Sequence, residues 1–320
     1  MRRRLSGIKP TGKIHLGNYF GAIKQYIDNQ DNGENFYFIA DYHALTTTPD
    51  PKQLAENSWD IILDYLAFGL DFNKSTIFIQ SSIPEHAELC WILSNLTPFG
   101  LMKRAHAFKA KGEEKINVGT FLYPVLMAAD ILMYDADLVP VGKDQKQHVE
   151  MARDIAIKFN SIYGEVFKIP DVEIMEEYET VKGIDGQKMS KSYGNTIEIF
   201  AEENKIKKQI MSIVTDSRGV EEPKDYEGCN IASLYKLFLN KEEQQLLKSR
   251  YEKGNIGYGT LKKELFEKIN NFIEPIRNRR KGLVKNIEDV KKELEKSSSF
   301  ARGIAKKKIQ QVRKAIGLPN

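Results

Sequence analysis

Residues 36–41 read FYFIAD, an unbroken apolar run rich in aromatic side chains that ends at a carboxylate. Two more short apolar runs are TIFIQSS at 76–82 and ADLVPVG at 136–142. Continuous apolar strands are typical of a parallel sheet that is covered on both faces. The three runs therefore predict strands of such a sheet.

Helical patterns separate these runs. In residues 16–27 the apolar side chains recur at i, i+3, i+4 and i+7, and residues 52–68, 123–134 and 144–159 also read as helices. Strands that alternate with helices predict a doubly wound, Rossmann-type α/β domain.

The second part of the chain has a different character. After about residue 193 the strand signal ends, and charged amphipathic stretches follow. We therefore expect an α/β domain at 1–190 and an all-helical domain at 191–320. The last stretch has apolar residues at helical spacing, which indicates a helix that packs back on the first domain; these residues are Ile304, Ile309, Val312 and Ile316.

Composition is that of an ordinary soluble globular enzyme, with 41% hydrophobic and 29% charged residues. We expect no membrane span and no secretory signal, because no long apolar run exists, even behind the basic start MRRRLSGIKPTG. Cys90 and Cys229 lie far apart without metal-ligand spacing, which predicts free buried thiols in a reducing cytoplasm.

The net charge of +4 conceals an uneven distribution. Residues 241–320 hold 21 Lys and Arg against 10 Asp and Glu, a net charge of +11, so the preceding residues carry −7. A basic C-terminal quarter indicates a polyanionic partner such as nucleic acid. The alternative is a solvated, lysine-rich helical surface.

The first motif is SGIKPTGKIHLGNYFGAI at 6–23, a glycine-punctuated loop that runs into a helix. Such a helix start can bind anions through free N–H groups and the helix dipole. Gly17 would let a flat base approach the backbone, and His15 and Asn18 could bind phosphate or ribose. The alternative is a structural turn before a core helix.

The second motif is GQKMSKSYGN at 186–195. Lys188 and Lys191 flank a Met-Ser pair in a loop that could close on a triphosphate and stabilise charge as pyrophosphate leaves. The alternative is a solvated lysine loop.

Together, HLGN at 15–18 and KMSKS at 188–192 resemble the signature of the class I aminoacyl-tRNA synthetases, with Asn18 in place of the usual histidine. The segments DYHALTT at 41–47, YPVLMAADILMYD at 123–135 and VPVGKDQKQHVEMARDI at 139–155 resemble the bacterial-type tryptophanyl-tRNA synthetases. The resemblance implies a Rossmann-type catalytic domain, a helical anticodon-binding domain, and tryptophan–tRNA ligase activity with ATP, Mg²⁺ and tRNA(Trp). It also implies a cytoplasmic homodimer.

A candidate tryptophan pocket combines apolar groups with one carboxylate. Met127 and Asp130 lie on one predicted helix, and Val139 and Val141 lie on the following strand. An indole has a single N–H donor, which Asp130 would accept. Because an unpartnered buried carboxylate is unfavourable, this ligand would also explain its presence. From helix position alone, Asp130 could instead face water or cap local structure.

The resemblance implies further site residues. Tyr123 and Gln145 correspond to residues that bind the ammonium and carboxylate of the amino acid, and Gly7 and His43 to residues near it. Without the resemblance, His43 would read as a core histidine. The implied ATP contacts are Lys9 (where many relatives have Gln), Pro10, Thr11, Gly17, Asn18, Gly142, Lys143, Asp144, Val181, Lys188, Met189, Ser190, Lys191 and Ser192. Lys111, with Lys188, Lys191 and His15, would act on the phosphates, whereas His86, His106 and His148 read as structural or solvent-facing.

The expected reaction needs no protein nucleophile. The tryptophan carboxylate attacks the α-phosphorus of ATP, and the 2′-hydroxyl of the terminal tRNA adenosine then attacks the adenylate, releasing AMP. The protein positions the reactants and neutralises charge, and Mg²⁺ would be held largely by phosphates and water. No long insertion is present, so we expect no editing domain.

Three alternatives remain open from the sequence. A tyrosyl-tRNA synthetase shares both signature motifs. A non-catalytic paralogue would bind tRNA or an amino acid on the same scaffold. A small-molecule nucleotidyltransferase can have the same H-x-G-x start, but it has no need of about 130 helical, basic residues after the lysine loop.

Overall fold

The computed structural model describes residues 2–47, 50–104, 117–142, 145–174 and 181–319. The chain forms two compact units. The sheet unit contains residues 1–12, 28–176 and 286–320, and the helical unit contains residues 13–27 and 177–285. The expected functional division at residue 190 stays a prediction.

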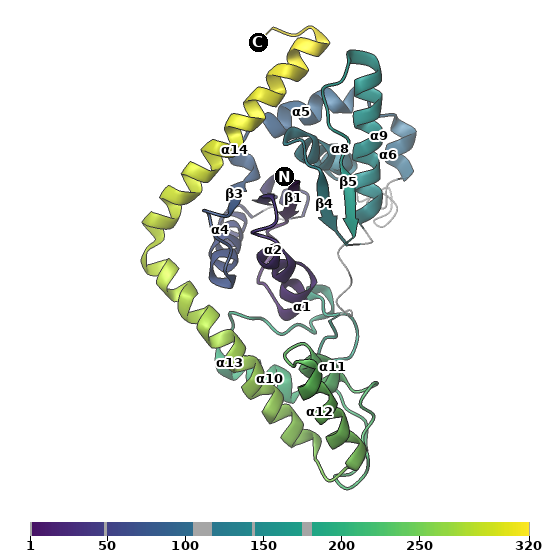
Figure 1. The fold of residues 1–320 in the computed structure, drawn as a ribbon, viewed down its shortest axis with the longest axis vertical. Coiled ribbons are helices and arrows are strands. Elements are labelled where there is room, and N and C mark those ends of the chain that lie inside the picture. Colours follow the sequence, from purple (N-terminus) through teal and green to yellow (C-terminus); the bar gives the residue numbers. More distant parts are fainter. Residues whose placement is uncertain (1, 48–49, 105–116, 143–144, 175–180, 320) are drawn as a thin grey trace. The chain divides into compact units, whose positions relative to one another are not determined.

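Five parallel strands form one sheet in the order β3-β2-β1-β4-β5 (Figure 1). They are β1 (Arg3–Ile8), β2 (Glu34–Ile39), β3 (Ser75–Ile79), β4 (Leu138–Val141) and β5 (Asp171–Ile174). The predicted Rossmann-type parallel sheet is confirmed. The strand order reverses between β1 and β4, and at such a switch point ligands bind beyond the carboxyl ends of the strands.

Strand β1 lies at the centre of the sheet, although its sequence RRLSGI is polar at its start. Leu5 is buried, while Arg3 donates to Glu34 at 2.8 Å and to the Tyr134 carbonyl at 2.5 Å. Arg4 pairs with Glu173 at 3.0 Å. These partners allow a central strand to begin with two arginines.

Helices cover the sheet and build the helical unit. Those of the sheet unit are α3 (Asp41–Ala44), α4 (Pro51–Phe68), η2 (Gln80–Ser82), α5 (Glu85–Ser94), α6 (Phe99–Arg104), α8 (Val118–Met133), α9 (Lys146–Tyr163) and α14 (Ile287–Ile316). Those that follow the first loop or lie in the helical unit are α1 (Leu16–Asn18), η1 (Tyr19–Ile23), α2 (Lys24–Asp28), η5 (Lys191–Tyr193), α10 (Glu203–Met211), α11 (Asn230–Lys236), α12 (Lys241–Lys253) and α13 (Tyr258–Lys285). The four predicted helical stretches and the predicted helical C-terminal region are confirmed.

The C-terminal helix α14 packs on the sheet unit beside β3, α5 and α8 (Figure 1). Its alanines and β-branched residues enter the core that contains the strands; they are Ala301, Ala305, Ile309 and Val312. The Ser297 hydroxyl accepts a hydrogen bond from the Ile77 N–H of edge strand β3 at 2.8 Å. Arg302 pairs with Glu85 of α5 at 3.2 Å, so α14 is joined to the unit by apolar and polar contacts.

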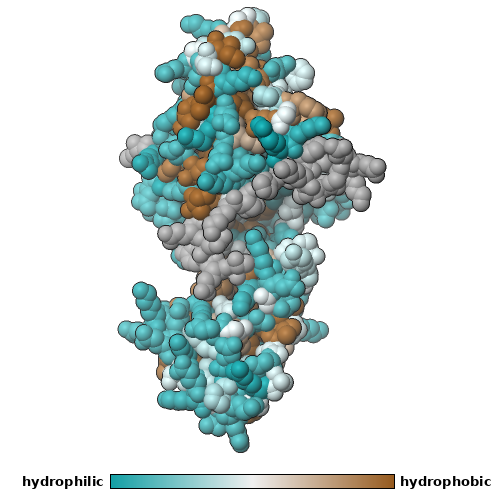
Figure 2. All heavy atoms as spheres, turned by 90° about the vertical axis from the view of Figure 1, so that its right-hand side faces the viewer, coloured by the Kyte–Doolittle hydropathy of each residue, from teal (hydrophilic) through white to brown (hydrophobic). Residues whose placement is uncertain are grey.

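The face drawn in Figure 2 is mainly hydrophilic with smaller hydrophobic patches. Among the exposed apolar side chains are Leu45, Trp91, Phe99 and Val118. Within the described residues, no helix is both long and apolar enough to cross a membrane. Both cysteines are free, but only Cys229 is buried, so the prediction of burial is wrong for Cys90, which is partly exposed.

Candidate active site

Asp130 lies on α8 and is only 1% exposed, so the alternative in which it faces water is wrong. Three side chains from other elements converge on its carboxylate. His43 of α3 meets Oδ2 at 2.7 Å, while Gln80 of η2 and His86 of α5 meet Oδ1 at 2.7 and 2.6 Å. Because an ionised carboxylate only accepts, each facing ring nitrogen carries a proton.

These contacts determine the charge of the group. Burial raises the pKa of the Asp130 carboxyl, but the hydrogen bonds from His43 and His86 outweigh it, so the pKa lies below its usual value. The charge is therefore stabilised within the protein. A bound indole is thus not needed to explain the buried carboxylate, and the role of Asp130 in binding stays a prediction.

Aromatic rings adjoin the carboxylate on the side of His43. The Tyr123 ring lies edge-on to His43, with centroids 4.6 Å apart, and 5.5 Å from the His148 ring. His43 is 5% exposed, and its Nδ1 has no hydrogen-bond partner among the described residues. Met127, one turn after Tyr123, is partly exposed. The structure thus brings together four of the predicted tryptophan contacts, including Asp130.

Other predicted contacts lie deeper in the core or in the first loop. Val139 and Val141 of β4 are both buried. A Cβ at Gly7, at the end of β1, would lie 2.4 Å from the Phe38 ring, so only glycine fits there. The Lys9 ammonium donates to the Thr46 hydroxyl at 3.0 Å.

In the helical unit the two signature motifs meet. The Gly17 N–H points to the Met189 sulfur at 3.3 Å, and a Cβ at Gly17 would lie 3.0 Å from the His15 ring. Burial, together with the positive charge of Lys191, lowers the pKa of His15 to about 4, so the ring is neutral at pH 7. Asn18 accepts from the His15 N–H at 3.2 Å and so orders the loop. His15 and Met189 thus leave little room for a side chain at position 17, and the expected approach of a base to Gly17 stays a prediction.

The lysine loop is organised around Asn195, which is 2% exposed. Its Oδ1 accepts from the Ser190 N–H at 2.8 Å, and its Nδ2 donates to the Lys188 carbonyl at 3.1 Å and to Asp185 at 2.7 Å. The side chains of Lys188 and Lys191 are exposed. The backbone of the loop is thus held by a buried amide, while both lysine residues are exposed.

The remaining predicted residues are placed as follows. Pro10 is buried and Thr11 is exposed. The Val181 carbonyl accepts from the Met189 N–H at 2.8 Å, the Ser192 hydroxyl bonds the Ser190 hydroxyl at 2.7 Å, and the Gly142 carbonyl accepts from the Gln145 N–H at 3.0 Å. Lys111, Lys143, Asp144 and His106 lie outside the described residues.

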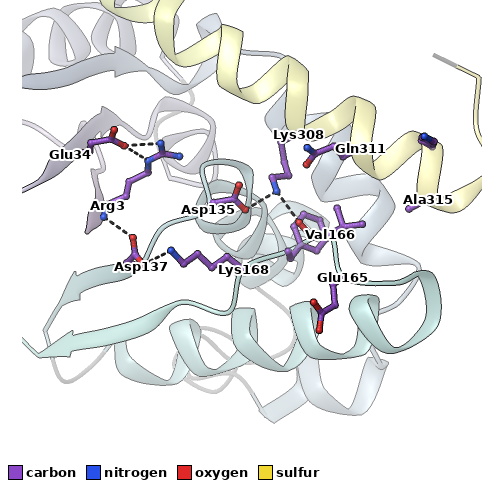
Figure 3. Close-up of a pocket in the computed structure, with 12 residues that line it drawn as sticks. Arg3, Glu34, Asp135, Asp137, Glu165, Val166, Lys168, Lys308, Gln311 and Ala315 are labelled. Carbon is purple, nitrogen blue, oxygen red and sulfur yellow. Dashed lines mark hydrogen bonds and ion pairs between the residues drawn. The ribbon is translucent and has the colours of Figure 1, made fainter. Parts of the chain in front are cut away.

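A cavity of about 1090 Å³ lies at the amino ends of the strands, on the side of the sheet opposite to their carboxyl ends (Figure 3). Arg3 and Asp137, at the amino ends of β1 and β4, line it, and Lys308 of α14 points into it toward Asp135, at 2.7 Å, and the Val166 carbonyl. Ligands of doubly wound sheets bind at the carboxyl ends, so we do not assign the reaction to this cavity.

The sequence reading missed two residues of the Asp130 cluster. His86 was expected to be structural or solvent-facing; it is structural, fully buried against the carboxylate, but its contact with Asp130 was not foreseen, and Gln80 was not predicted at all. One signal was available for Gln80, because it directly follows the last residue of buried strand β3, where the carboxyl end of the sheet lies.

Comparison with known proteins gives three concordant findings. Residues 2–274 match the family of tRNA synthetases class I (W and Y). A tryptophan–tRNA ligase of Fusobacterium nucleatum is 54% identical over 99% of this chain and 98% of its own length. Two solved tryptophanyl-tRNA synthetases superpose on the chain. That of Campylobacter jejuni, complexed with ADP and tryptophan, has a TM-score of 0.93 and 48% identity, covering 99% of this chain and 100% of its own. That of Mycoplasma pneumoniae has a TM-score of 0.83 and 29% identity, covering 100% of this chain and 98% of its own.

Proposed function

The chain belongs to the class I tRNA synthetases for tryptophan and tyrosine, and from this premise we infer that it is a tryptophan–tRNA ligase. The observation that carries the inference is the end-to-end match to tryptophan–tRNA ligases. It favours tryptophan over tyrosine within the family. The intact KMSKS loop speaks against a non-catalytic paralogue.

The ligase binds ATP and tryptophan and joins them before it meets the tRNA. The tryptophan carboxylate attacks the α-phosphorus of ATP, and pyrophosphate leaves with the electron pair of the broken P–O bond. The 2′-hydroxyl of the terminal adenosine of tRNA(Trp) then attacks the adenylate carbonyl, and AMP leaves. The side chains position the reactants and stabilise charge, because the substrate itself supplies the nucleophile.

For tryptophan we propose that Asp130 accepts the indole N–H. A carboxylate offers about four lone-pair positions, and three are occupied by His43, Gln80 and His86, so a single N–H donor completes the set. Tyr123 and Gln145 would bind the ammonium and carboxylate groups. Met127, Val139, Val141, Gly7 and His43 would surround the substrate.

For ATP we propose that the exposed ammonium groups of Lys188 and Lys191, with Lys111, stabilise charge on the phosphates. His15 is neutral at pH 7 and would act as a hydrogen-bond donor rather than as a cation. Among the described residues, no cluster of three or more His, Cys, Asp or Glu could hold a metal ion. Mg²⁺ would therefore enter with ATP, bound mainly by phosphate oxygens and water.

We further propose that residues 191–320 contribute the tRNA anticodon contacts, supported by the net charge of +11 over residues 241–320. A cytoplasmic homodimer is proposed as well. Leu45 and Val118 are exposed apolar side chains on neighbouring segments, since Thr46 lies 3.8 Å from the Cβ position of Gly119, and exposed apolar side chains would be covered in a subunit interface. Light scattering at micromolar concentration tests the dimer.

ATP–pyrophosphate exchange measured with each of the twenty amino acids tests the main proposal. We expect exchange that depends on tryptophan. Exchange with tyrosine alone would assign the chain to the other branch of the family. Tryptophan binding without any exchange would identify a non-catalytic paralogue.

A further inference from the structure

The two oxygens of Asp130 are held differently. Oδ1 has two donors, Gln80 Nε2 at 2.7 Å and His86 Nδ1 at 2.6 Å. Oδ2 has His43 Nε2 at 2.7 Å, and no other donor among the described residues contacts it. Since each oxygen offers two lone pairs, Oδ1 is saturated and Oδ2 retains one acceptor position.

Each of the two residues that donate to Oδ1 is held in place by a second hydrogen bond. Gln80 is fully buried, and its Oε1 accepts from the Tyr42 N–H at 3.2 Å, which determines that its Nε2 faces Asp130. His86 is fully buried too, and its Nε2 lies 2.7 Å from the Tyr134 hydroxyl. A neutral His86 accepts a hydrogen bond at Nε2 and donates one from Nδ1, so both ring nitrogens are satisfied.

Tyr134, the last residue of this series of hydrogen bonds, is held by packing. Tyr134 is 0% exposed, and its ring lies against Phe36 and Phe78 with centroids 5.4 and 5.3 Å apart. Burial raises the pKa of the Tyr134 hydroxyl well above its usual range, so it keeps its proton. By contrast, His43 has no second partner at Nδ1 among the described residues. The Oδ1 side is therefore the rigid side of the carboxylate.

We propose that His86 and Gln80 are positioning residues for tryptophan recognition, which anchor Oδ1 of Asp130 so that Oδ2 presents its one open acceptor position to the indole N–H. The inference rests on the proposed function and deepens it. Neither residue touches the substrate. A carboxylate that could rotate would accept the ring N–H less well. Binding of a ring without an N–H donor would not be weakened by that rotation.

The test compares tryptophan with β-(benzothiophen-3-yl)alanine, in which sulfur replaces the ring N–H. The quantity measured is the ratio of kcat/KM for the two amino acids in ATP–pyrophosphate exchange. The main variant is His86→Phe with Tyr134→Phe, which removes the donor and also the hydroxyl that would be left unpaired. Tyr134→Phe alone is the matched control, because both donors to Oδ1 remain.

We expect the ratio to fall about tenfold in the double variant, mainly through KM for tryptophan, and to stay unchanged in Tyr134→Phe. His86→Asn places an amide N–H near the position of Nδ1 and should restore most of the preference. A purely structural role would lower kcat/KM for both amino acids equally, and an unchanged ratio overturns the proposal. If the wild-type protein shows no tryptophan-dependent exchange, the proposed function itself fails.

Two further measurements keep the proposal testable if the double variant does not fold. Gln80→Met removes the other donor to Oδ1 and should shift the ratio in the same direction. In the wild-type protein, long-range ¹H–¹⁵N spectra should show His86 as the neutral tautomer protonated at Nδ1. A neutral His86 with its proton on Nε2 could not donate to Oδ1 from Nδ1, and that result would contradict the anchoring contact.

Discussion

Replacing Asp130 with Asn changes one atom of the cluster and should damage recognition more than folding. With the amide oxygen in the place of Oδ1, the bonds from Gln80 and His86 survive. The amide N–H₂ then faces His43, which must move its proton to the buried Nδ1, where no described residue accepts it. One unsatisfied buried donor costs about 1–3 kcal/mol of folding free energy.

The effect on tryptophan is larger because the open acceptor position becomes a donor. The indole N–H loses a hydrogen bond to a charged oxygen, which contributes about 1.5–3 kcal/mol, and now faces another N–H. At about 1.4 kcal/mol for each factor of ten, the lost bond alone should lower kcat/KM for tryptophan by roughly 10–10², and the facing N–H groups should lower it further. The loss should appear mainly in KM, since the contact does not involve the reacting carboxylate.

Pyrophosphate exchange provides the assay, and urea unfolding measures the cost to stability. β-(Benzothiophen-3-yl)alanine is the control, because without a ring N–H its kcat/KM should change less than about threefold. An unchanged KM for tryptophan in Asp130→Asn would refute the assigned contact. An equal loss for both amino acids would show that the substitution acts through structure alone.

Three further outcomes are expected. The lowered pKa of His15 means that between pH 6.5 and about 4 the unfolded chain binds a proton that the folded chain does not. The free energy of unfolding should therefore fall by at most about 3 kcal/mol as the pH drops through this window. Urea unfolding checks this, because His15→Gln should lose this part of the pH dependence. Lys308→Met leaves the partly exposed Asp135 without its 2.7 Å partner and should lower the free energy of unfolding by about 1–3 kcal/mol; adding Asp135→Asn should recover part of that loss, and strict additivity would argue against the pair. Gly7→Ala places a Cβ 2.4 Å from the Phe38 ring and should destabilise the protein by about 1–3 kcal/mol; combining it with Phe38→Leu should relieve the effect in thermal melts, and a neutral single variant would contradict the close contact.

The strands that the sequence revealed are those whose residues are apolar throughout. β2, β3 and β4 were predicted from FYFIAD, TIFIQSS and ADLVPVG. β1 escaped notice because Arg3 and Arg4 begin it, and their compatibility with a central strand depends on Glu34 and Glu173, which lie far away in sequence. β5 reads DVEI, and its charged residues are tolerated because it is the edge strand of the sheet.

The candidate site also contains residues that were predicted from the sequence and residues that were not. Asp130 and His43 were singled out through a resemblance, and the structure adds that they touch at 2.7 Å. The part played by Gln80 and His86 depends on how η2 and α5 pack against α8, and no local pattern encodes that packing. A buried carboxylate on an apolar helix does require donors, so their existence could be expected but not their identity.

The docking of α14 on the sheet unit has a consequence for synthesis. Ala301, Ala305, Ile309 and Val312 belong to the same core as the strands, and Ser297 covers a backbone N–H of edge strand β3. Chains fold from the N-terminus as they are made, but the core of this unit lacks the packing contacts of α14 until residues 287–316 have left the ribosome. The sheet, whose last strand ends at Ile174, therefore has an apolar face and an open strand edge while residues 175–286 and then α14 are being made. Exposed apolar surface and an unpaired strand edge favour aggregation, and the docking of α14 removes both.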